Sequence, residues 1–289
     1  MARASQASCC VRERIAQQES RLVMCLNCSV TSEDILKLPP PPADARISYG
    51  TDDNQFGEIR LPKTKGPFPL VMNIHGGFWR AKYDLTHAGH LCAALTAKGL
   101  ATWNVAYRRV GDPGGGWPGT FEDIRNAYRF VPQLVKQYNL DSTKILVMVH
   151  SAGGQLALCL AAHEASLKHI ISLAGVVDLQ RAWELHLSNN AVVDFLGGKP
   201  NEVREHYHEA DPMQLSVSHS TTQWLIHGAG DDVVPSYFSR NYAQGKQKRG
   251  EDVHYLEISA AGHFDLIDPR SKAWPRVENT LRHELGLQG

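Results

Sequence analysis

The sequence predicts an α/β fold in which helices flank a mostly parallel central sheet. Apolar segments typical of strands recur eight times along the chain, and helical patterns separate most of the later ones. Such alternation is typical of parallel sheets, whose sites lie at the carboxyl edge of the strands. With 289 residues, 43% of them hydrophobic, the chain can bury one sizeable core.

The predicted strands follow the chain in order. The first two lie close together and predict an antiparallel hairpin at one edge of the sheet. The full set covers residues 45–49, 57–61, 70–74, 101–106, 145–149, 169–173, 223–226 and 253–258.

Two helices can be placed between these strands. Residues 85–98 carry apolar side chains at helical spacing and end before Gly99. Thr120-Phe121-Glu122-Asp123 predicts the start of a second helix through a Thr-x-x-Asp variant of the capping box. This second helix is expected to run to about Tyr138.

Residues 176–219 depart from the simple alternation. Their sequence predicts several short helices placed before the strand at 223–226. Such an insertion fits either a partial lid over the site or an ordinary crossover that packs on the sheet.

Residues 1–43 are predicted to be an N-terminal extension that ends in a proline-rich connector. Pro39-Pro40-Pro41-Pro42 favours an extended polyproline conformation. Upstream, Cys25 and Cys28 have zinc-like spacing, but neither a second pair of matching spacing nor a nearby histidine follows. We therefore predict no metal site and no other cofactor.

Composition excludes several classes of function. The net charge is zero, which argues against nucleic acid or an anionic membrane as a partner. No apolar run approaches the roughly 20 residues of a transmembrane helix, and the first ten residues lack the apolar core of a secretory signal. We expect a cytoplasmic protein that binds a small molecule, and the sequence leaves a homodimer open.

A serine lies on a predicted sharp turn between a strand and a helix. The apolar run at 145–149 leads into His150-Ser151-Ala152-Gly153-Gly154, and a helical pattern follows. Small residues are needed at such a turn, because the serine takes a strained conformation and the strand and helix pass closely. The pattern predicts Ser151 as the nucleophile on a nucleophile elbow.

A serine hydroxyl needs a base and an orienting acid to act as a nucleophile near neutral pH. Asp231 follows the strand at 223–226 in a Gly-containing loop, with Asp232 as the alternative acid. Among 14 histidines, His263 alone combines a loop position, a preceding glycine and a place after the acid. We predict Ser151, Asp231 and His263 as the triad, and expect His227 to satisfy the loop behind the acid.

An oxyanion site is predicted at the end of the strand at 70–74. Gly76 and Gly77 follow that strand, and glycines let backbone N–H groups approach a substrate oxygen closely. The N–H group of Ala152, directly after the nucleophile, is expected to complete the site.

One residue departs from the usual Gly-x-Ser-x-Gly pattern, because Val149 replaces the first glycine. Overpacking a tight site costs roughly 1–3 kcal/mol unless neighbouring small residues compensate. We expect reduced or altered activity, and a higher rate after Val149→Gly.

These motifs resemble a known family. His75-Gly76-Gly77-Phe78-Trp79 looks like the His-Gly-Gly-x-Trp signature of kynurenine formamidases and related esterases in the α/β-hydrolase superfamily. The elbow, residues 227–235 and residues 262–269 match the same group, and the resemblance covers roughly residues 44 to 285. It implies an α/β-hydrolase domain at 44–289 with the triad and oxyanion donors named above. The spacing Asp-x-x-Val-Pro favours Asp231 as the acid.

Aromatic and basic residues near the oxyanion loop are candidates for substrate binding. Arg108 or Arg109 could pair bidentately with a substrate carboxylate, or each could form a structural ion pair. The predicted substrate-binding residues are Phe78, Trp79, Tyr107, Arg108 and Trp117.

Three functions fit these residues. The favoured one is an arylformamidase that converts N-formylkynurenine to kynurenine and formate through a formyl-enzyme intermediate. A general carboxylesterase acting on short acyl or aryl esters needs the same groups at the reacting centre. The third is a catalytically silent hydrolase fold that serves as a binding module.

Overall fold

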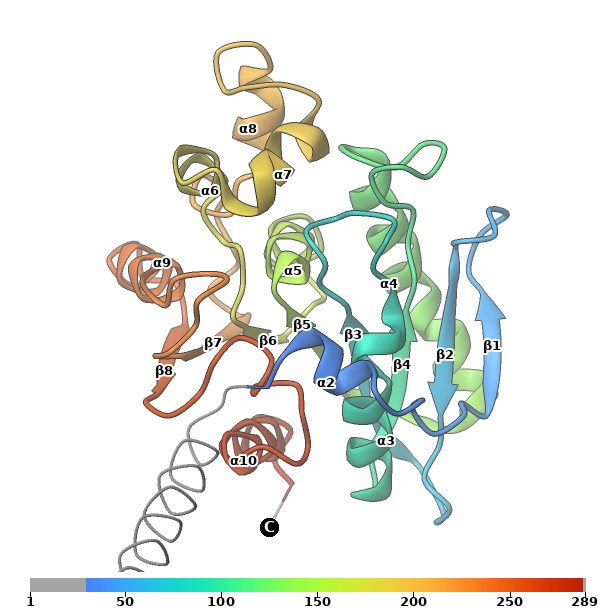
Figure 1. Cartoon of the computed structure of the whole chain (residues 1–289). Helices are drawn as coiled ribbons and strands as arrows, with labels where there is room; N and C mark the ends of the chain where they lie inside the picture. Colours follow the sequence, from blue (N-terminus) through green and yellow to red (C-terminus); the bar gives the residue numbers. More distant parts are fainter. Residues whose placement is uncertain (1–29, 288–289) are drawn as a thin grey trace, which may run out of the picture.

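An eight-stranded sheet forms the centre of the computed structural model, which describes residues 30–287 (Figure 1). Its strands are β1 (Ala45–Ser48), β2 (Phe56–Arg60), β3 (Phe68–Ile74), β4 (Ala101–Val105), β5 (Leu140–His150), β6 (His169–Leu173), β7 (Thr222–Gly228) and β8 (Val253–Ile258). They lie in the order β1-β2-β4-β3-β5-β6-β7-β8. β2 runs antiparallel to β1 and β4, and the other neighbouring pairs are parallel. The predicted fold class and edge hairpin are confirmed.

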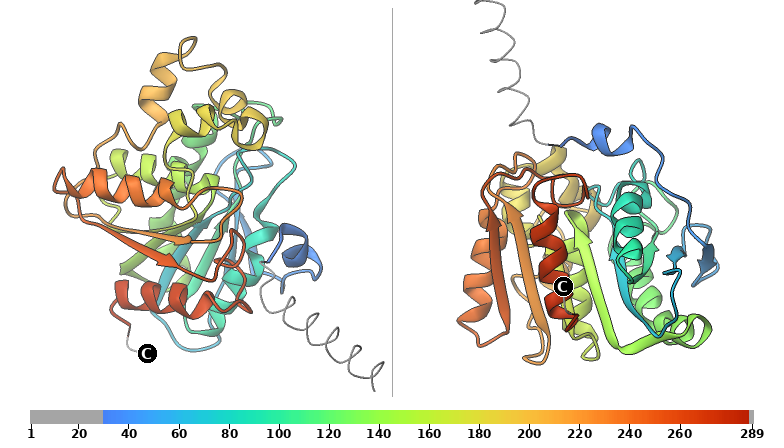
Figure 2. Two further views of the ribbon diagram at one scale, coloured as in Figure 1. Left: turned by 60° about the vertical axis from the view of Figure 1, so that its left-hand side comes forward. Right: turned by 90° about the horizontal axis from the view of Figure 1, so that it is seen from below.

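Helices connect the strands and cover both faces of the sheet (Figure 2). Within residues 30–287, no helix is long and apolar enough to span a bilayer. The helices are α2 (Ser32–Leu36), the 3-10 helix η1 (Leu85–Ala88), α3 (Gly89–Ala97), α4 (Gly119–Tyr138), α5 (Ala152–His163), α6 (Leu179–Glu184), α7 (Leu187–Leu196), α8 (Arg204–Ala210), α9 (Tyr237–Gln247) and α10 (Trp274–Glu284).

The alternation of side chains along β5 shows how the two faces are filled. Val147 and Val149 belong to the core beneath α4, α5 and α9, whereas Leu146 and Met148 belong to the core beneath α3 and α10. All four side chains are fully buried. A strand buried on both faces must be apolar throughout, which explains the unbroken hydrophobic run in the sequence.

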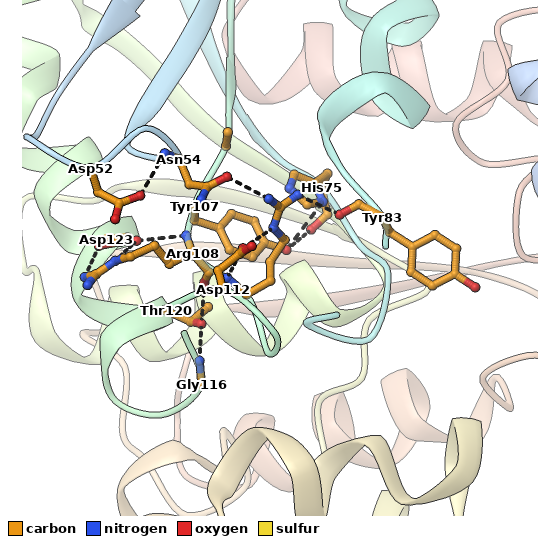
Figure 3. Close-up of polar contacts among 12 residues, drawn as sticks. Asp52, Asn54, His75, Tyr83, Tyr107, Arg108, Asp112, Gly116, Thr120 and Asp123 are labelled. Carbon is orange, nitrogen blue, oxygen red and sulfur yellow. Dashed lines mark hydrogen bonds and ion pairs between the residues drawn. The ribbon is translucent and has the colours of Figure 1, made fainter. Parts of the chain in front are cut away.

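The start of α4 differs from the predicted capping box. The N-cap is Pro118, and no side chain caps the helix. Instead, the Thr120 hydroxyl donates to the carbonyl of Arg108 (2.6 Å), and Asp123 accepts from the backbone and guanidinium of Arg108 (Figure 3). The prediction was wrong because both polar side chains hold the loop after β4 rather than their own helix.

The described part of the predicted N-terminal extension packs as part of the main domain. Thr31 and Asp34 form a reciprocal capping box at the start of α2. Ile35 is only 2% exposed and belongs to the core that contains Leu91 and Leu95 of α3. Farther along, Arg60 donates to the carbonyl of Pro41 (3.0 Å). Residues 35 and 41, from the predicted extension, therefore contact the domain that follows them.

Residues 176–219 contain the short helices α6, α7 and α8, as predicted. These helices gather at the top of Figure 1, on the side of α5 and opposite α10. The carboxyl ends of the parallel strands β3, β5, β7 and β8 lead into the loops that carry the predicted site residues. Parallel strands bring these ends to one edge, which is where the fold class predicts a site.

Ile35→Ala should lower the free energy of unfolding by about 2–4 kcal/mol, because it removes a buried side chain from a packed core. Leu36→Ala, on the same helix but 44% exposed, is the matched control and should have little effect. Denaturant unfolding followed by tryptophan fluorescence measures both. Equal effects of the two changes would mean that α2 does not contribute to the stability of the folded domain.

Candidate active site

Ser151 lies on a sharp turn between β5 and α5. Its backbone angles are φ 55° and ψ −122°, and a positive φ is strained for a residue with a Cβ. Two hydrogen bonds hold this conformation: the Ser151 N–H donates to the carbonyl of Leu173 (2.9 Å), and the Val176 N–H donates to the carbonyl of Ser151 (3.0 Å). The exit of β6 therefore fixes the turn and presents the serine side chain at the sheet edge.

The two glycines after the serine let α5 approach the sheet. A Cβ on Gly153 would lie 2.7 Å from the carbonyl oxygen of Ile74, and a Cβ on Gly154 would lie 2.7 Å from the Cα of Gly175. Both distances are too short for a side chain. The small residues of the motif are thus required by close packing on two sides of the helix start.

Val149 fits into this packing without displacing the elbow. The side chain is fully buried in the core beneath α5. A Cβ on Gly153 would lie only 3.3 Å from the Cβ of Val149, so the missing side chain on the helix leaves room for the valine on the strand. The small residue that makes room for Val149 is Gly153 on α5. The expectation that Val149 impairs the elbow by overpacking is therefore contradicted.

His263 and Asp231 form a close pair. The Nδ1–H of His263 donates to Oδ2 of Asp231 (2.7 Å), and the other carboxylate oxygen accepts from the N–H groups of Val233 (2.9 Å) and Val234 (2.8 Å). The aspartate side chain is fully buried and that of the histidine is 3% exposed. The structure thus pairs His263 with Asp231, not with the neighbouring Asp232.

His227 supports the aspartate from behind, as expected from the sequence. Its Nε2 faces the carbonyl of Val234 (2.9 Å) and Oδ2 of Asp231 (3.2 Å), and Nδ1 faces the hydroxyl of Ser239 (2.7 Å). The two acceptors at Nε2 assign the proton to that nitrogen. Burial by itself would raise the pKa of Asp231, but the hydrogen bonds from His227 and His263 hold it well below its usual value.

His150, directly before the serine, supports the histidine. Its Nε2–H donates to the backbone carbonyl of His263 (3.1 Å), and the two rings lie 4.5 Å apart. Burial and the nearby His263 lower the pKa of His150 well below its ordinary value, so this ring is neutral near pH 7. His150 is not among the predicted site residues, although its position directly before the nucleophile was an available signal.

The Gly76–Gly77 segment approaches the serine closely. A Cβ on Gly76 would lie 2.8 Å from the Cβ of Ser151, so only glycine fits between loop and serine. Gly77, Phe78 and Trp79 have φ angles of 105°, 49° and 57°, three consecutive residues in the left-handed region. The loop therefore stores strain that the surrounding contacts must offset.

Trp79 supplies one of those contacts and is not a substrate-binding residue. Its indole N–H donates to Oε1 of Gln155 on α5 (3.1 Å), and its ring stacks on Phe195 of α7 with centroids 4.5 Å apart. The side chain is 1% exposed. Its predicted role was wrong because the residue is used to anchor the loop to two helices.

Tyr107 also holds the loop from beneath (Figure 3). Its hydroxyl donates to the carbonyl of His75 (2.8 Å), and the two rings stack 4.4 Å apart. The Nδ1–H of His75 donates in turn to the carbonyl of Gly76 (2.8 Å), and burial lowers the pKa of His75 to about 3. Tyr107 is fully buried, so its predicted contact with substrate was wrong as well.

The two arginines considered for carboxylate recognition are engaged in ion pairs within the protein. Arg108 binds both oxygens of Asp123, as Figure 3 shows, with the shorter contact at 2.6 Å. Arg109 binds Asp112 (3.1 Å) and the side chain of Asn54 (2.8 Å). The structural alternative is therefore confirmed for both residues.

A cavity of about 550 Å³ opens over the serine. Phe78 is the only predicted substrate-binding residue among those that line it; Trp117 instead stacks on Phe121 with centroids 5.2 Å apart. The lining also includes residues from α2, from the α6–α7 connection and from the loops after β7 and β8. It consists of Ser32, Glu33, Gly76, Gly77, Phe78, Tyr83, His87, His150, Ser151, Leu185, His186, Leu187, Ser188, Asp232, Val233, His263 and Phe264.

Side chains that could bind a metal ion do not cluster in the described part of the chain. Residues 30–287 contain no group of three or more His, Cys, Asp or Glu side chains that could hold a metal ion. Cys92 and Cys159 are buried free thiols. Cys25 and Cys28, considered for zinc, lie outside the described residues.

Comparison with known proteins agrees with this geometry. The BD-FAE family profile matches residues 58–245. Esterase LipQ of Mycobacterium tuberculosis is 25% identical over 68% of this chain and 51% of its own length. The kynurenine formamidase of Drosophila melanogaster is 21% identical over 82% of this chain and 80% of its own length. The chain spans about half the length of the first curated relatives it matches.

Solved structures confirm the fold. An esterase from the Planctomycetes species Thermogutta terrifontis superposes with a TM-score of 0.69 at 20% identity, covering 84% of this chain and 92% of that one. Identity at this level shows the fold alone, and the fold is that of the α/β-hydrolases.

The buried neutral state of His75 predicts a pH dependence of stability. Its folded pKa of about 3 lies below its ordinary value of 6.5, so protonation favours the unfolded state as the pH falls. This contribution is fully present above pH 6.5 and should fall by about 2 kcal/mol between pH 6.5 and 5. His75→Gln should flatten the pH dependence of the unfolding free energy, measured by denaturant titration. His283→Gln, at an exposed position, should leave the slope unchanged.

Val149→Gly should lower the free energy of unfolding by about 2–4 kcal/mol, because it empties a packed core site and adds a flexible residue to a strand. We expect no gain in kcat. Val147→Gly, buried on the same face of β5, is the matched control and should behave alike. A faster Val149→Gly enzyme would show that the valine does strain the elbow.

Proposed function

This chain belongs to the BD-FAE family, and we propose that it is a serine hydrolase that cleaves short acyl or aryl esters. His263, which lines the cavity together with Ser151 and is paired with Asp231, carries the proposal. The esterase relatives support it, and the family match over residues 58–245 includes the elbow region.

In the proposed first step, Ser151 Oγ attacks the carbonyl carbon of the ester. His263 Nε2 takes the hydroxyl proton as the new C–O bond forms. Asp231 holds the Nδ1–H of His263 and stabilises the imidazolium that results. The low pKa of the aspartate keeps it ionised throughout.

The negative charge that develops on the carbonyl oxygen needs backbone donors. Ala152 begins α5, where N–H groups have no partner within the helix. Gly76 lies against Ser151, and Gly77 follows it in the strained loop. We propose that the N–H groups of these three residues bind the oxyanion.

The second half of the reaction returns the enzyme to its starting state. His263 gives its proton to the departing alcohol as the C–O bond of the ester breaks. Water then attacks the acyl-enzyme, His263 accepts a proton from that water, and the carboxylic acid leaves as Ser151 regains its hydrogen.

An ester is favoured over N-formylkynurenine by the charges around the cavity. No Lys or Arg occurs among the cavity-lining residues within 30–287, and Arg108 and Arg109 are paired elsewhere. The carboxylate of N-formylkynurenine would therefore lack a cationic partner, and this loss opposes the attraction between its ammonium group and the carboxylates of the cavity. Arylformamidase activity stays as the second candidate, supported by the resemblance to the Drosophila formamidase over most of both chains.

We also propose that residues 176–219 act as a partial lid rather than as a simple crossover. Residues 185–188, from the α6–α7 connection and the first residues of α7, form one side of the cavity. Three residues at the start of α7, Ser188, Asn189 and Asn190, have positive φ angles of 47°, 54° and 57°. Because the backbone is strained there, we propose that this side of the cavity changes conformation when a ligand binds.

The test compares kcat/KM for p-nitrophenyl acetate and N-formyl-L-kynurenine, with Ser151→Ala as the blank. We expect the ester to be preferred about tenfold or more, because the formamide carboxylate loses charge-assisted hydrogen bonds. A preference for the formamide would establish the second candidate. If neither compound reacts and a fluorophosphonate fails to label Ser151, the fold serves as a silent binding module.

Asp231→Asn should lower kcat on p-nitrophenyl acetate by about 10³–10⁴, because the amide cannot hold His263 in the productive tautomer. Asp232→Asn is the matched change one residue away. It should lower kcat on this neutral ester by no more than about threefold, the scale of a surface substitution. Equal losses would contradict the assignment of the acid.

A further inference from the structure

The cavity over Ser151 carries two carboxylates that no basic side chain in its lining balances. Glu33 comes from α2 and Asp232 from the loop after β7, and the cavity-lining residues within 30–287 include no Lys or Arg. Ser151 is 2% exposed and lines the same cavity as both carboxylates. A substrate that reaches Ser151 therefore lies within the field of both carboxylates.

Glu33 is held in place because α2 is firmly attached. The Ser32 hydroxyl bonds to Nε2 of His87 (2.8 Å), and Ile35 is buried in the core. Thr31 and Asp34 cap the helix reciprocally. Glu33 is exposed, but it lines the cavity from a helix that is attached to the folded domain.

Two of the four histidines that line the cavity, His87 and His150, do not cancel this charge. Burial lowers the pKa of His87, against the opposing influence of Asp84 and Glu33, and His150 is neutral as described above. Outside the lining, Arg80 donates to the carbonyl of Ser188, but its charge is paired with Asp194 at 3.1 Å.

We propose that Glu33 is a specificity-determining residue that makes this cavity favour esters carrying an ammonium group over esters carrying a carboxylate. The proposal rests on the esterase function above and names its substrate class. Glu33 and Asp232 are exposed where they line the cavity, so their charges attract a cationic substrate and repel an anionic one through solvent that salt can screen. The N-terminal segment thus contributes to substrate choice, although it carries none of the proposed triad.

The test measures kcat/KM for three esters in wild type, Glu33→Gln and Glu33→Lys. The esters are p-nitrophenyl acetate (neutral), acetylthiocholine (cationic) and p-nitrophenyl hemisuccinate (anionic). Each variant is compared with wild type on the same ester, so the intrinsic reactivity of each ester cancels. Glu209→Lys, an exposed position near the end of α8 outside the cavity lining, is the matched control.

Glu33→Lys should lower kcat/KM for the cationic ester about fivefold or more and raise it for the anionic ester by a similar factor. Glu33→Gln should shift both in the same directions by a smaller factor, and the neutral ester should change less than about twofold. Raising the salt from about 0.05 to 0.5 M should shrink these shifts through screening. Equal changes on all three esters, or the same shifts in Glu209→Lys, would overturn the proposal.

A binding measurement separates this proposal from the esterase function. Dissociation constants of phenylboronic acid, 4-(aminomethyl)phenylboronic acid and 4-carboxyphenylboronic acid can be obtained by calorimetry without turnover. We expect the cationic boronate to bind more tightly than the anionic one, and Glu33→Lys to reverse that order. Lack of p-nitrophenyl acetate turnover would refute the esterase function, whereas affinities that do not depend on the charge of the boronate would refute the role of Glu33.

Discussion

The close approach of α5 to the ends of β3 and β5 is the constraint on which the rest of the site depends. Gly153 and Gly154 allow it, since a Cβ at either position would meet backbone or side-chain atoms of neighbouring strands and loops. The same approach forces the strained conformation of Ser151 and brings Gly76 against its side chain. Core packing, nucleophile geometry and the oxyanion loop are therefore parts of a single packing arrangement.

That strain persists because buried contacts oppose its release. Trp79 fastens the oxyanion loop to α5 and α7, and Tyr107, in the loop after β4, supports it through the carbonyl of His75. These aromatic residues resemble binding residues in the sequence, since they lie beside the motif. In the structure they hold the backbone of the oxyanion loop in place. A preorganised oxyanion site depends on such fixed backbone N–H groups.

Contacts within the protein also determine which charges of the site face the cavity. Asp231 accepts hydrogen bonds from His263, Val233 and Val234 with His227 behind it, so its charge is compensated within the protein. Three arginines of the neighbouring loops, Arg80, Arg108 and Arg109, are paired with carboxylates of their own. What reaches the cavity uncompensated is negative, from α2 and from the loop after β7, and this gives the proposed hydrolase a basis for choosing among substrates by charge.

The sequence alone determined the strands, their alternation with helices and the order of Ser151, Asp231 and His263, because apolar periodicity and turn chemistry are local. Only the tertiary structure decided which polar groups face the cavity. Arg108 forms an ion pair with Asp123, fifteen positions later along the chain, and is therefore not available to a substrate carboxylate. Gly153, which leaves room for Val149, lies on the following helix. Glu33 lines the cavity although the sequence predicts that its segment lies outside the domain. Each depends on contacts between distant segments, which no local pattern encodes.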